Sequence, residues 1–306
     1  MKHDNLNLGQ RILLEILWGM SWLFAIMPYW FKYYVVQSFL YFVLYHCLHY
    51  RMKVVMENLR NSFPEKSEEE LKIVARKFYI TLAEMFVDTI NLAHMPEKKI
   101  RRLVKVRNLE EHLAATEGKD WVALTAHYGC WEYCSFWVAY AVNQELVAVY
   151  HPLHNALMDA LYRRLRDLPH VVTVPMRESM RYYIKHRDRG VEGRRLVMGL
   201  IADQNPPRRP DSYWFRFLNQ DTIFFDGGEK LAMKYKLPVY FCHLKRVKRG
   251  CYEMSLELIS DGKTKAKPNE ITEKYVRTLE RAIREQPEMW IWSHRRWKHK
   301  REDGKS

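Results

Sequence analysis

His127 and Glu132 are the two residues of this sequence whose types and spacing best suit acid–base chemistry. An imidazole ordinarily titrates at about pH 6.5, so it can accept the proton of an attacking hydroxyl at neutral pH. A carboxylate on the other ring nitrogen fixes the tautomer and stabilises the imidazolium that forms. The segment 121–137, WVALTAHYGCWEYCSFW, therefore holds a candidate general base and a candidate orienting acid.

Gly129 lies between these two side chains and decides whether they can meet. On one regular helix, residues five apart point roughly 140° away from each other. We therefore predict a buried strand over 121–125, a turn at Gly129 and a helix that begins at Trp131. This arrangement puts His127 at the carboxyl end of a strand and Glu132 in the first turn of a helix, where an acid suits the helix dipole.

The elements that must position this pair alternate along the chain between strands and helices. Strands are predicted at 121–125, 146–150, 171–174, 196–202, 238–244 and 253–258, and helices at 51–63, 67–92, 156–166 and 270–284. This alternation is typical of an α/β fold with a mixed, largely parallel sheet flanked by helices. In such sheets, ligands bind at the carboxyl ends of the strands.

The first fifty residues form a separate, apolar part of the chain. Residues 12–48 divide near Pro28 into two apolar pieces, each near the lower length limit for crossing a hydrocarbon core of about 30 Å. We predict an N-terminal membrane-associated helical segment at 1–50 and a catalytic domain at 51–306. One spanning helix, a helical hairpin and a segment lying in the membrane surface remain alternatives.

The overall charge indicates anionic partners. The 306 residues carry a net charge of +14, which suits phospholipid headgroups, nucleic acid or an acidic carrier protein. Five scattered cysteines without a CxxC pair argue against a disulfide framework or a structural zinc site. The tail WIWSHRRWKHKR, residues 290–301, predicts either an interfacial surface or, for Trp290 and Trp292, core positions. Because the N-terminal segment already favours a bilayer, we expect membrane binding and no nucleic-acid partner.

Several segments resemble one enzyme family. The hexapeptide HYGCWE, from His127 to Glu132, resembles the HX4(D/E) motif of glycerolipid acyltransferases, in the HFGxWE form of the bacterial lipid A late acyltransferases. Other segments that are similar to this family follow in the same order along the chain. They are RMKVVMENLRNSFPE (51–65), VYHP (149–152), DQNP (203–206), FLNQDT (217–222) and PEMWIWSHRRWK (287–298).

The resemblance implies transfer of a fatty acyl group from acyl carrier protein or acyl-CoA to a hydroxyl of a lipid A precursor or a related lipid. His127 would be the general base and Glu132 its orienting carboxylate, with no cofactor and no metal. The expected location is the bacterial inner membrane, with the catalytic domain on the cytoplasmic side, which agrees with the bases that follow the apolar segment.

Five further residues are candidates for substrate binding. Arg164, Arg166 and Arg177 follow predicted strands, and a guanidinium suits bidentate binding of phosphate. His151 stands where the family usually has arginine. Asp203 ends a predicted strand, where it could position a basic residue or a substrate hydroxyl.

Other functions remain open from the sequence alone. The acceptor could be a glycerolipid or an aminolipid. The same His–Glu pair could activate water in a membrane lipid hydrolase, although no GxSxG nucleophile elbow is present. A non-catalytic binding protein is a third alternative, and it would tolerate the loss of His127.

Overall fold

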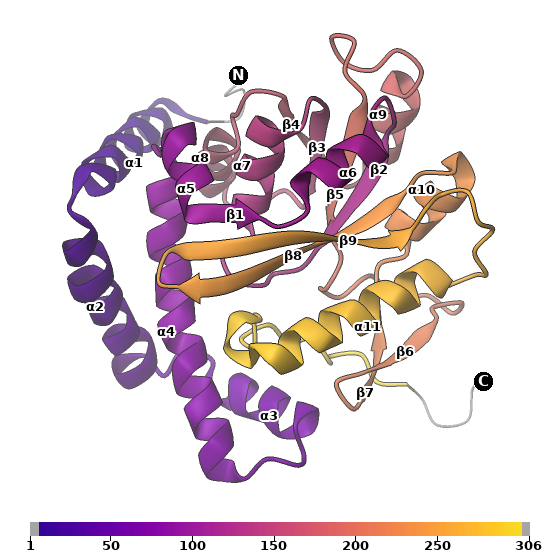
Figure 1. The fold of residues 1–306 in the computed structure, drawn as a ribbon. Helices are drawn as coiled ribbons and strands as arrows, with labels where there is room; N and C mark the ends of the chain where they lie inside the picture. The colour runs from indigo at the N-terminus through magenta and orange to yellow at the C-terminus, as the bar shows by residue number, and fades with distance from the viewer. Residues whose placement is uncertain (1–5, 302–306) are drawn as a thin grey trace.

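A seven-stranded sheet forms the centre of the molecule (Figure 1). The computed structural model describes residues 6–301. The strands lie in the order β1-β9-β8-β2-β5-β3-β4, and a separate hairpin joins β6 and β7. Their bounds are β1 Val104–Val106, β2 Trp121–Thr125, β3 Glu145–Tyr150, β4 Val171–Pro175, β5 Leu196–Ile201, β6 Trp214–Phe217, β7 Gln220–Ile223, β8 Val239–Lys248 and β9 Cys251–Ser260. Apart from the antiparallel β8–β9 pair, all neighbours in the sheet are parallel, which confirms the predicted fold class.

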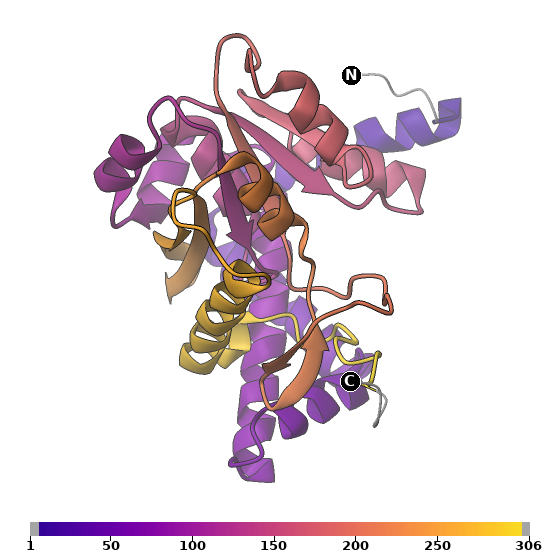
Figure 2. The ribbon, with the colours of Figure 1, turned by 90° about the vertical axis from the view of Figure 1, so that its right-hand side faces the viewer.

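Helices surround the sheet. They are α1 Leu8–Ile26, α2 Gln37–Phe42, α3 Met52–Ser62, α4 Glu68–Leu92, α5 Glu97–Leu103, α6 Leu109–Thr116, α7 Glu132–Ala141, α8 Ala156–Leu165, α9 Ser179–His186, α10 Gly227–Tyr235 and α11 Glu270–Glu285, with short helical turns η1 Phe31–Val36, η2 Val43–Cys47 and η3 Pro287–Met289. The long helix α4 runs past the end of the sheet toward α3 (Figure 2). It begins with the predicted capping box, in which Ser67 and Glu70 bond each other's backbone N–H groups.

The sequence pattern predicted the long central strands and missed the short peripheral elements. All six predicted strands are present, and the limits of β2 are those predicted. The patterns did not indicate β1, the β6–β7 hairpin, α5, α6, α9 or α10. These elements are ten residues or shorter, so they carry too few residues for a periodic pattern to emerge.

The N-terminal apolar segment folds as a bent pair of helical runs. The chain breaks after α1, at Pro28, and continues through η1, α2 and η2. Within residues 6–301, no single helix has the length and hydropathy needed to cross a bilayer, and α1 and the run Phe31–Cys47 satisfy that test only together. The helical path bends by 110° between these two runs.

Lys32 fixes this bend from inside. Its side chain is buried, and its Nζ donates to Ala25 O at 3.0 Å, near the end of α1, and to Asn91 Oδ1 at 2.8 Å on α4. A cation at a helix C-terminus satisfies carbonyls that have no partner within the helix. The bend is therefore held against the rest of the molecule by hydrogen bonds as well as by apolar packing.

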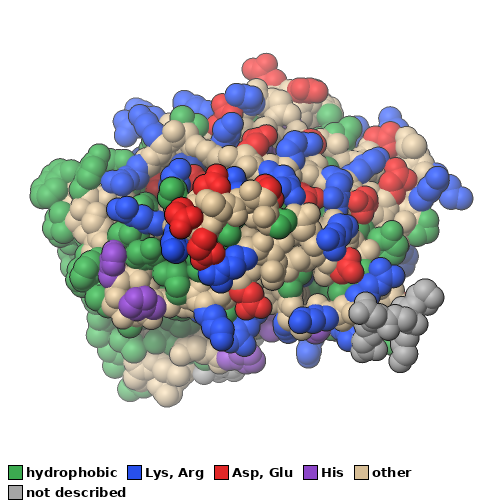
Figure 3. Space-filling model, turned by 90° about the horizontal axis from the view of Figure 1, so that it is seen from below, with side chains coloured by type: hydrophobic (Ala, Val, Ile, Leu, Met, Phe, Trp, Pro, Cys, Tyr) green, Lys and Arg blue, Asp and Glu red, His purple; other side chains and the backbone are tan. Residues whose placement is uncertain are grey.

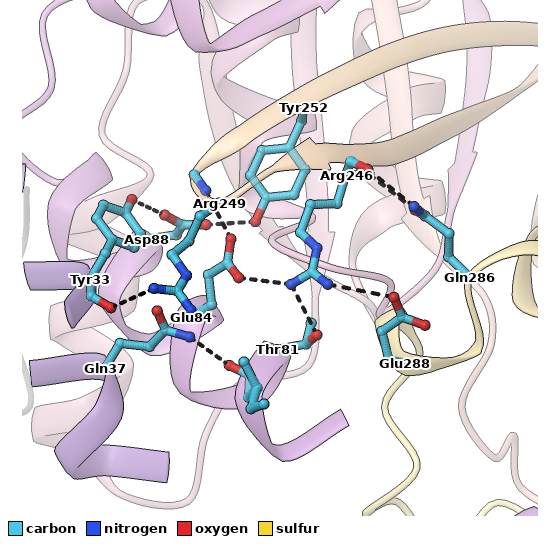
Figure 4. Close-up of polar contacts among 12 residues, drawn as sticks. Tyr33, Gln37, Thr81, Glu84, Asp88, Arg246, Arg249, Tyr252, Gln286 and Glu288 are labelled. Atoms are coloured by element: carbon cyan, nitrogen blue, oxygen red, sulfur yellow. Dashed lines mark hydrogen bonds and ion pairs between the residues drawn. The ribbon is translucent and has the colours of Figure 1, made fainter. Parts of the chain in front are cut away.

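A buried polar cluster joins η1 to α4 and to the β8–β9 hairpin (Figure 4). The Asp88 carboxylate accepts hydrogen bonds from Tyr33 Oη and, at 2.6 Å, from Tyr252 Oη. One turn earlier on α4, Glu84 forms an ion pair with Arg246 at 2.8 Å. Because buried carboxylates are costly without partners, these contacts fix how the N-terminal segment lies on the sheet domain.

The outward face of the N-terminal segment is apolar. Figure 3 shows hydrophobic side chains gathered on the side of the molecule that α1 and α2 occupy. Large exposed side chains there include Ile12, Ile16, Trp22, Leu23, Trp30, Tyr34, Phe39 and Phe42. A contiguous patch of this kind marks an interaction surface on a protein.

Candidate active site

His127 and Asp203 are brought together by the register of two neighbouring strands. In the parallel β2–β5 pair, the last residues Thr125 and Ile201 are register partners, and His127 and Asp203 each follow two residues after the end of their strand. His127 Nδ1 lies 2.7 Å from Asp203 Oδ1, and the His127 backbone N–H donates to Asp203 Oδ2 at 3.0 Å. The predicted place of His127, at the carboxyl end of a strand, is confirmed.

Asp203 is fully buried and well supplied with donors. Burial by itself would raise the pKa of Asp203, but the His127 imidazole and the hydrogen bonds from His127 and Trp290 outweigh this and lower it. The third donor is Trp290 Nε1, at 2.9 Å from Oδ2. Asp203 is therefore a carboxylate at neutral pH, able to hold a proton on the facing ring nitrogen.

The hydrogen bonds of His127 define its tautomer. With Nδ1 donating to Asp203, Nε2 has a free lone pair. Gln204 Nε2 lies 3.2 Å from His127 Nε2, so the amide donates and the ring nitrogen accepts. A substrate hydroxyl that takes the place of this amide would meet an acceptor, which is the state that a general base requires.

Glu132 binds Arg166 instead of the imidazole. Its two oxygens accept from Arg166 at 2.5 and 3.0 Å, and both side chains are largely buried. The expected contact between Glu132 and His127 is thus replaced by one between Asp203 and His127. The physical reason is that Glu132 begins α7 beside α8, where a buried guanidinium needs a counter-charge, while Asp203 arrives on the adjacent strand.

The predicted turn at Gly129 is present. Gly129 has a φ of +56°, a conformation that glycine adopts without strain, and a Cβ there would lie 2.4 Å from Met289 Cε. Its N–H donates to Met289 O at 2.8 Å. The chain therefore reverses direction closely against the C-terminal segment before α7 begins at Glu132.

A cavity of about 740 Å³ opens beside the imidazole. Its polar lining includes His127, Glu132, Arg166 and Gln204, with His151 at an exposed position. Its remaining lining is mainly apolar and comes from α7, α10 and the faces of β2, β3 and β5. The site thus joins a potential base, a guanidinium and a largely apolar space, whose volume is typical of ligand pockets.

The other predicted binding residues lie in different places. Arg164 points away from the cavity to α1, where it pairs with Glu15 at 2.6 Å and stacks over the Trp18 ring at 4.5 Å. Arg177 is exposed and is not among the residues that line the cavity. Arg166 is the arginine that the fold brings to His127's cavity.

The two tryptophans at the start of the aromatic tail lie in the core. Trp290 and Trp292 are buried, as is Arg296, which donates to Asn205 Oδ1 and Ile223 O. The core alternative for the two tryptophans is therefore confirmed, and they cannot form an interfacial surface. Within residues 6–301, no group of three or more His, Cys, Asp or Glu side chains is arranged to hold a metal ion.

A comparison with known protein families identifies the family of this chain. The sequence profile of the bacterial lipid A biosynthesis acyltransferases matches residues 5–299. The chain belongs to this family. It is accordingly an enzyme, a lipid acyltransferase, and the resemblance seen in the sequence is confirmed.

Among the solved structures, an acyltransferase is similar to this chain, whereas the curated proteins give no match. The 1-acyl-sn-glycerophosphate acyltransferase PlsC from Thermotoga maritima is similar over 89% of this chain and 98% of that chain, with 14% identity and a TM-score of 0.36. No curated protein matches the chain.

Three residues of this candidate site are not predicted by the sequence alone. Gln204 and Trp290 lie in motifs that were noticed, but nothing local connects either residue to His127. Trp131, whose ring centroid lies 4.7 Å from that of His127, was assigned only to the start of a helix. The position of Gln204 next to Asp203 was the one usable signal, because both follow the end of a strand.

Proposed function

We propose that this lipid acyltransferase moves a fatty acyl group from a thioester to a lipid hydroxyl, with His127 as the general base. The observation that carries the proposal is the hydrogen bond between His127 Nδ1 and Asp203, which leaves Nε2 as an acceptor at the cavity. In this assignment, Asp203 is the carboxylate that orients the imidazole. Glu132, predicted from the sequence to be catalytic, is proposed here as a positioning residue for the arginine that it binds.

The reaction is a direct transfer. The substrate hydroxyl gives its proton to His127 Nε2 while its oxygen attacks the thioester carbonyl carbon. The tetrahedral intermediate collapses, the carbon–sulfur bond breaks, and the imidazolium returns the proton to the leaving thiolate. The buried Asp203 carboxylate stabilises the imidazolium between these two steps.

Arg166 is the proposed electrophilic partner. Its guanidinium lines the cavity and is held by both oxygens of Glu132. Burial lowers the pKa of Arg166, but the Glu132 carboxylate outweighs burial and raises it, so the charge is permanent. A fixed cation at this place suits the developing oxyanion or a phosphate of the substrate, and His151 would contact the substrate nearer the cavity mouth.

The apolar part of the cavity is the proposed acyl-binding space. Ala123 on β2, Gly199 on β5 and Ala148 on β3 lie in one row across the sheet, and all three line the cavity. Residues with so little side chain leave room between the sheet and α7. Leu146 and Val138 line the cavity further from the strand ends, so its apolar lining continues past this row of small residues.

The bent N-terminal segment is the proposed membrane attachment. Its apolar outer face would lie in a bilayer, and its buried polar contacts tie it to the domain that holds the cavity. This arrangement favours a hairpin that lies in one leaflet, with residues 51–306 as the catalytic domain on the cytoplasmic side of the bacterial inner membrane. A lipid acceptor could then reach His127 without leaving the bilayer.

The family and the net charge support a proposed donor and a proposed acceptor. The surplus of 50 Lys and Arg over 36 Asp and Glu suits the acidic surface of acyl carrier protein, which we propose as donor ahead of acyl-CoA. A lipid A precursor is the proposed acceptor, with a glycerolipid or an aminolipid as the alternative. No cofactor enters the proposed chemistry.

Lipid mass spectrometry tests the proposal. Cells that express the wild type should contain a lipid that gains one acyl chain, and His127→Ala should abolish this gain. His186→Ala is the matched control, because His186 lies on α9 and does not line the cavity. A His127→Ala enzyme that still acylates would overturn the assignment of the base, and release of free fatty acid without acylated lipid would indicate the hydrolase.

A further inference from the structure

The segment that follows α11 contacts Asp203 and the turn after His127, although the proposed reaction does not use it. Met289 O accepts the Gly129 N–H of the turn after His127, and Trp290 pairs with Tyr128 in an isolated bridge. Trp290 Nε1 then reaches Asp203. One short stretch of chain therefore bonds the turn that carries the imidazole and the acid that orients it.

The Asp203 carboxylate has a separate partner set on each oxygen. Oδ1 meets His127 Nδ1 at 2.7 Å. Oδ2 accepts from the His127 backbone N–H at 3.0 Å and from Trp290 Nε1 at 2.9 Å. A carboxylate that rotates about its last side-chain bond must break the bonds at Oδ2, so the indole N–H opposes rotation of Oδ1 away from the imidazole.

Trp290 is well placed to act as a fixed donor. Its side chain is 1% exposed and stands edge-on to the rings of Trp292 and Phe217, at centroid distances of 4.8 and 5.8 Å. It does not line the cavity. A residue that is rigid, buried and outside the cavity can influence the reaction only through the groups that it touches.

We propose that Trp290 is a positioning residue for the general base: its indole N–H holds one oxygen of Asp203 so that the other meets the His127 imidazole. The inference rests on the proposed role of His127. It assigns a function to the tryptophan of the PEMWIW segment, which the proposed chemistry leaves without one.

Replacement of Trp290 by phenylalanine removes the donor and keeps an aromatic ring. We expect kcat to fall roughly tenfold to a hundredfold, the range that corresponds to one hydrogen bond to a charged group. KM should change little, because Trp290 lies outside the cavity. The acidic limb of the pH profile of kcat/KM should move to higher pH, because a carboxylate with one donor fewer keeps the imidazolium protonated to higher pH.

Trp292→Phe is the matched control. Trp292 is equally buried, lies two residues away and also donates an indole hydrogen bond, but to Pro287 O at 2.6 Å. Both variants should lose thermal stability, whereas only Trp290→Phe should lower kcat and shift the pH profile. The assay uses the full chain in detergent micelles, with myristoyl acyl carrier protein and an underacylated lipid A precursor as substrates.

A second variant covers the case in which Trp290→Phe does not fold. Benzothienylalanine at position 290 replaces the indole N–H with sulfur and keeps the shape of the ring. It should reproduce the loss of kcat and the pH shift with little change in melting temperature. If this variant keeps the wild-type kcat and pH profile, Trp290 is only structural. The same conclusion follows if Trp290→Phe and Trp292→Phe have the same kcat and the same pH profile.

The proposed role of His127 and the proposed role of Trp290 can be disproved independently. If His127→Ala keeps activity, the proposed base is wrong, whatever Trp290 does. If His127→Ala is inactive while the Trp290 variants match Trp292→Phe in kcat and pH profile, the base stands and the positioning role is wrong.

Discussion

Two buried carboxylates beside the same cavity differ in their partners. Asp203 accepts an imidazole, a backbone N–H and an indole N–H, while Glu132 accepts both arms of a guanidinium. The first set can exchange a proton with the substrate through His127. The second keeps a positive charge in place, because Arg166 cannot lose its proton in the working pH range.

Glu132→Gln tests this separation of roles. It removes the counter-charge of Arg166, whose side chain is only 14% exposed, and should lower the free energy of unfolding by about 3–5 kcal/mol. Urea unfolding of the purified protein measures the change. Asp159→Asn is the control, because it breaks the more exposed ion pair between Asp159 and Arg163 within α8. It should lower the free energy of unfolding by less than about 1 kcal/mol. Equal losses of unfolding free energy in the two variants would contradict the importance of the buried Glu132–Arg166 ion pair.

At the scale of elements, the strands supply the floor of the acyl-binding space. Because side chains alternate between the two faces of a strand, the row of Ala123, Gly199 and Ala148 faces the cavity, while Val147 faces the opposite side. The size of the side chains in this row therefore sets how much of the slot is open.

Ala148→Leu should shorten the preferred acyl chain. The larger side chain fills part of the slot, and each excluded methylene loses about 0.8 kcal/mol, or roughly fourfold in relative kcat/KM. Competition among lauroyl, myristoyl and palmitoyl donors measures the preference. Val147→Leu changes a buried residue of the same strand that does not line the cavity, so it should leave the preference unchanged. An unaltered chain preference in Ala148→Leu would mean that the acyl chain binds elsewhere.

Helix α4 carries a buried acid, Asp88, whose ionisation opposes folding. Burial, and then the neighbouring Glu84 carboxylate, raise the pKa of Asp88 to about 7. An acid whose pKa is raised in the folded state stabilises the fold fully below its unfolded pKa of about 4, and this contribution is lost as the pH rises through 7.

Asp88→Asn should remove this pH dependence. Relative to the variant, the wild type should lose a few kcal/mol of unfolding free energy between about pH 4 and 7, at about 1.4 kcal/mol for each unit of pKa shift. Denaturant unfolding across this pH range measures the difference. Asp188→Asn is the control, at a side chain that is 77% exposed. Its curve of unfolding free energy against pH should run parallel to that of the wild type. Parallel curves for Asp88→Asn would show that Asp88 ionises as readily folded as unfolded.

At the scale of the whole molecule, one side is apolar and the net charge is strongly positive (Figure 3). The apolar side belongs to α1, η1 and α2, which the polar cluster of Figure 4 joins to the sheet. This combination suits the surface of an anionic bilayer, to which aromatic side chains contribute burial and basic residues contribute attraction.

Trp30→Glu and Phe39→Glu should weaken binding to vesicles of anionic phospholipid. These side chains are 59% and 64% exposed, and the burial of each in a bilayer would contribute about 1.5–3 kcal/mol, so each variant should lose roughly tenfold or more in partitioning. Vesicle flotation measures bound protein. Leu258→Glu, at an exposed position on β9, is the control for adding a negative charge. Wild-type flotation by both variants would place the membrane contact elsewhere.

Features that depend only on neighbouring residues can be predicted from the sequence of this protein. The strand before His127, the turn at Gly129 and the capping box at Ser67 are each encoded within a few positions, because alternation, a positive φ and a capping hydrogen bond are local properties. The α/β class followed from the order of such elements along the chain.

The contacts between side chains of the site depend on the folded arrangement of distant segments. His127 and Asp203 are 76 residues apart, and their contact depends on the adjacency and register of β2 and β5. Glu132, close to His127 in sequence, turns to Arg166, and Trp290 enters from the other end of the chain. Side-chain partners across a sheet are set by strand order and by the burial of charge, and both are properties of the folded whole.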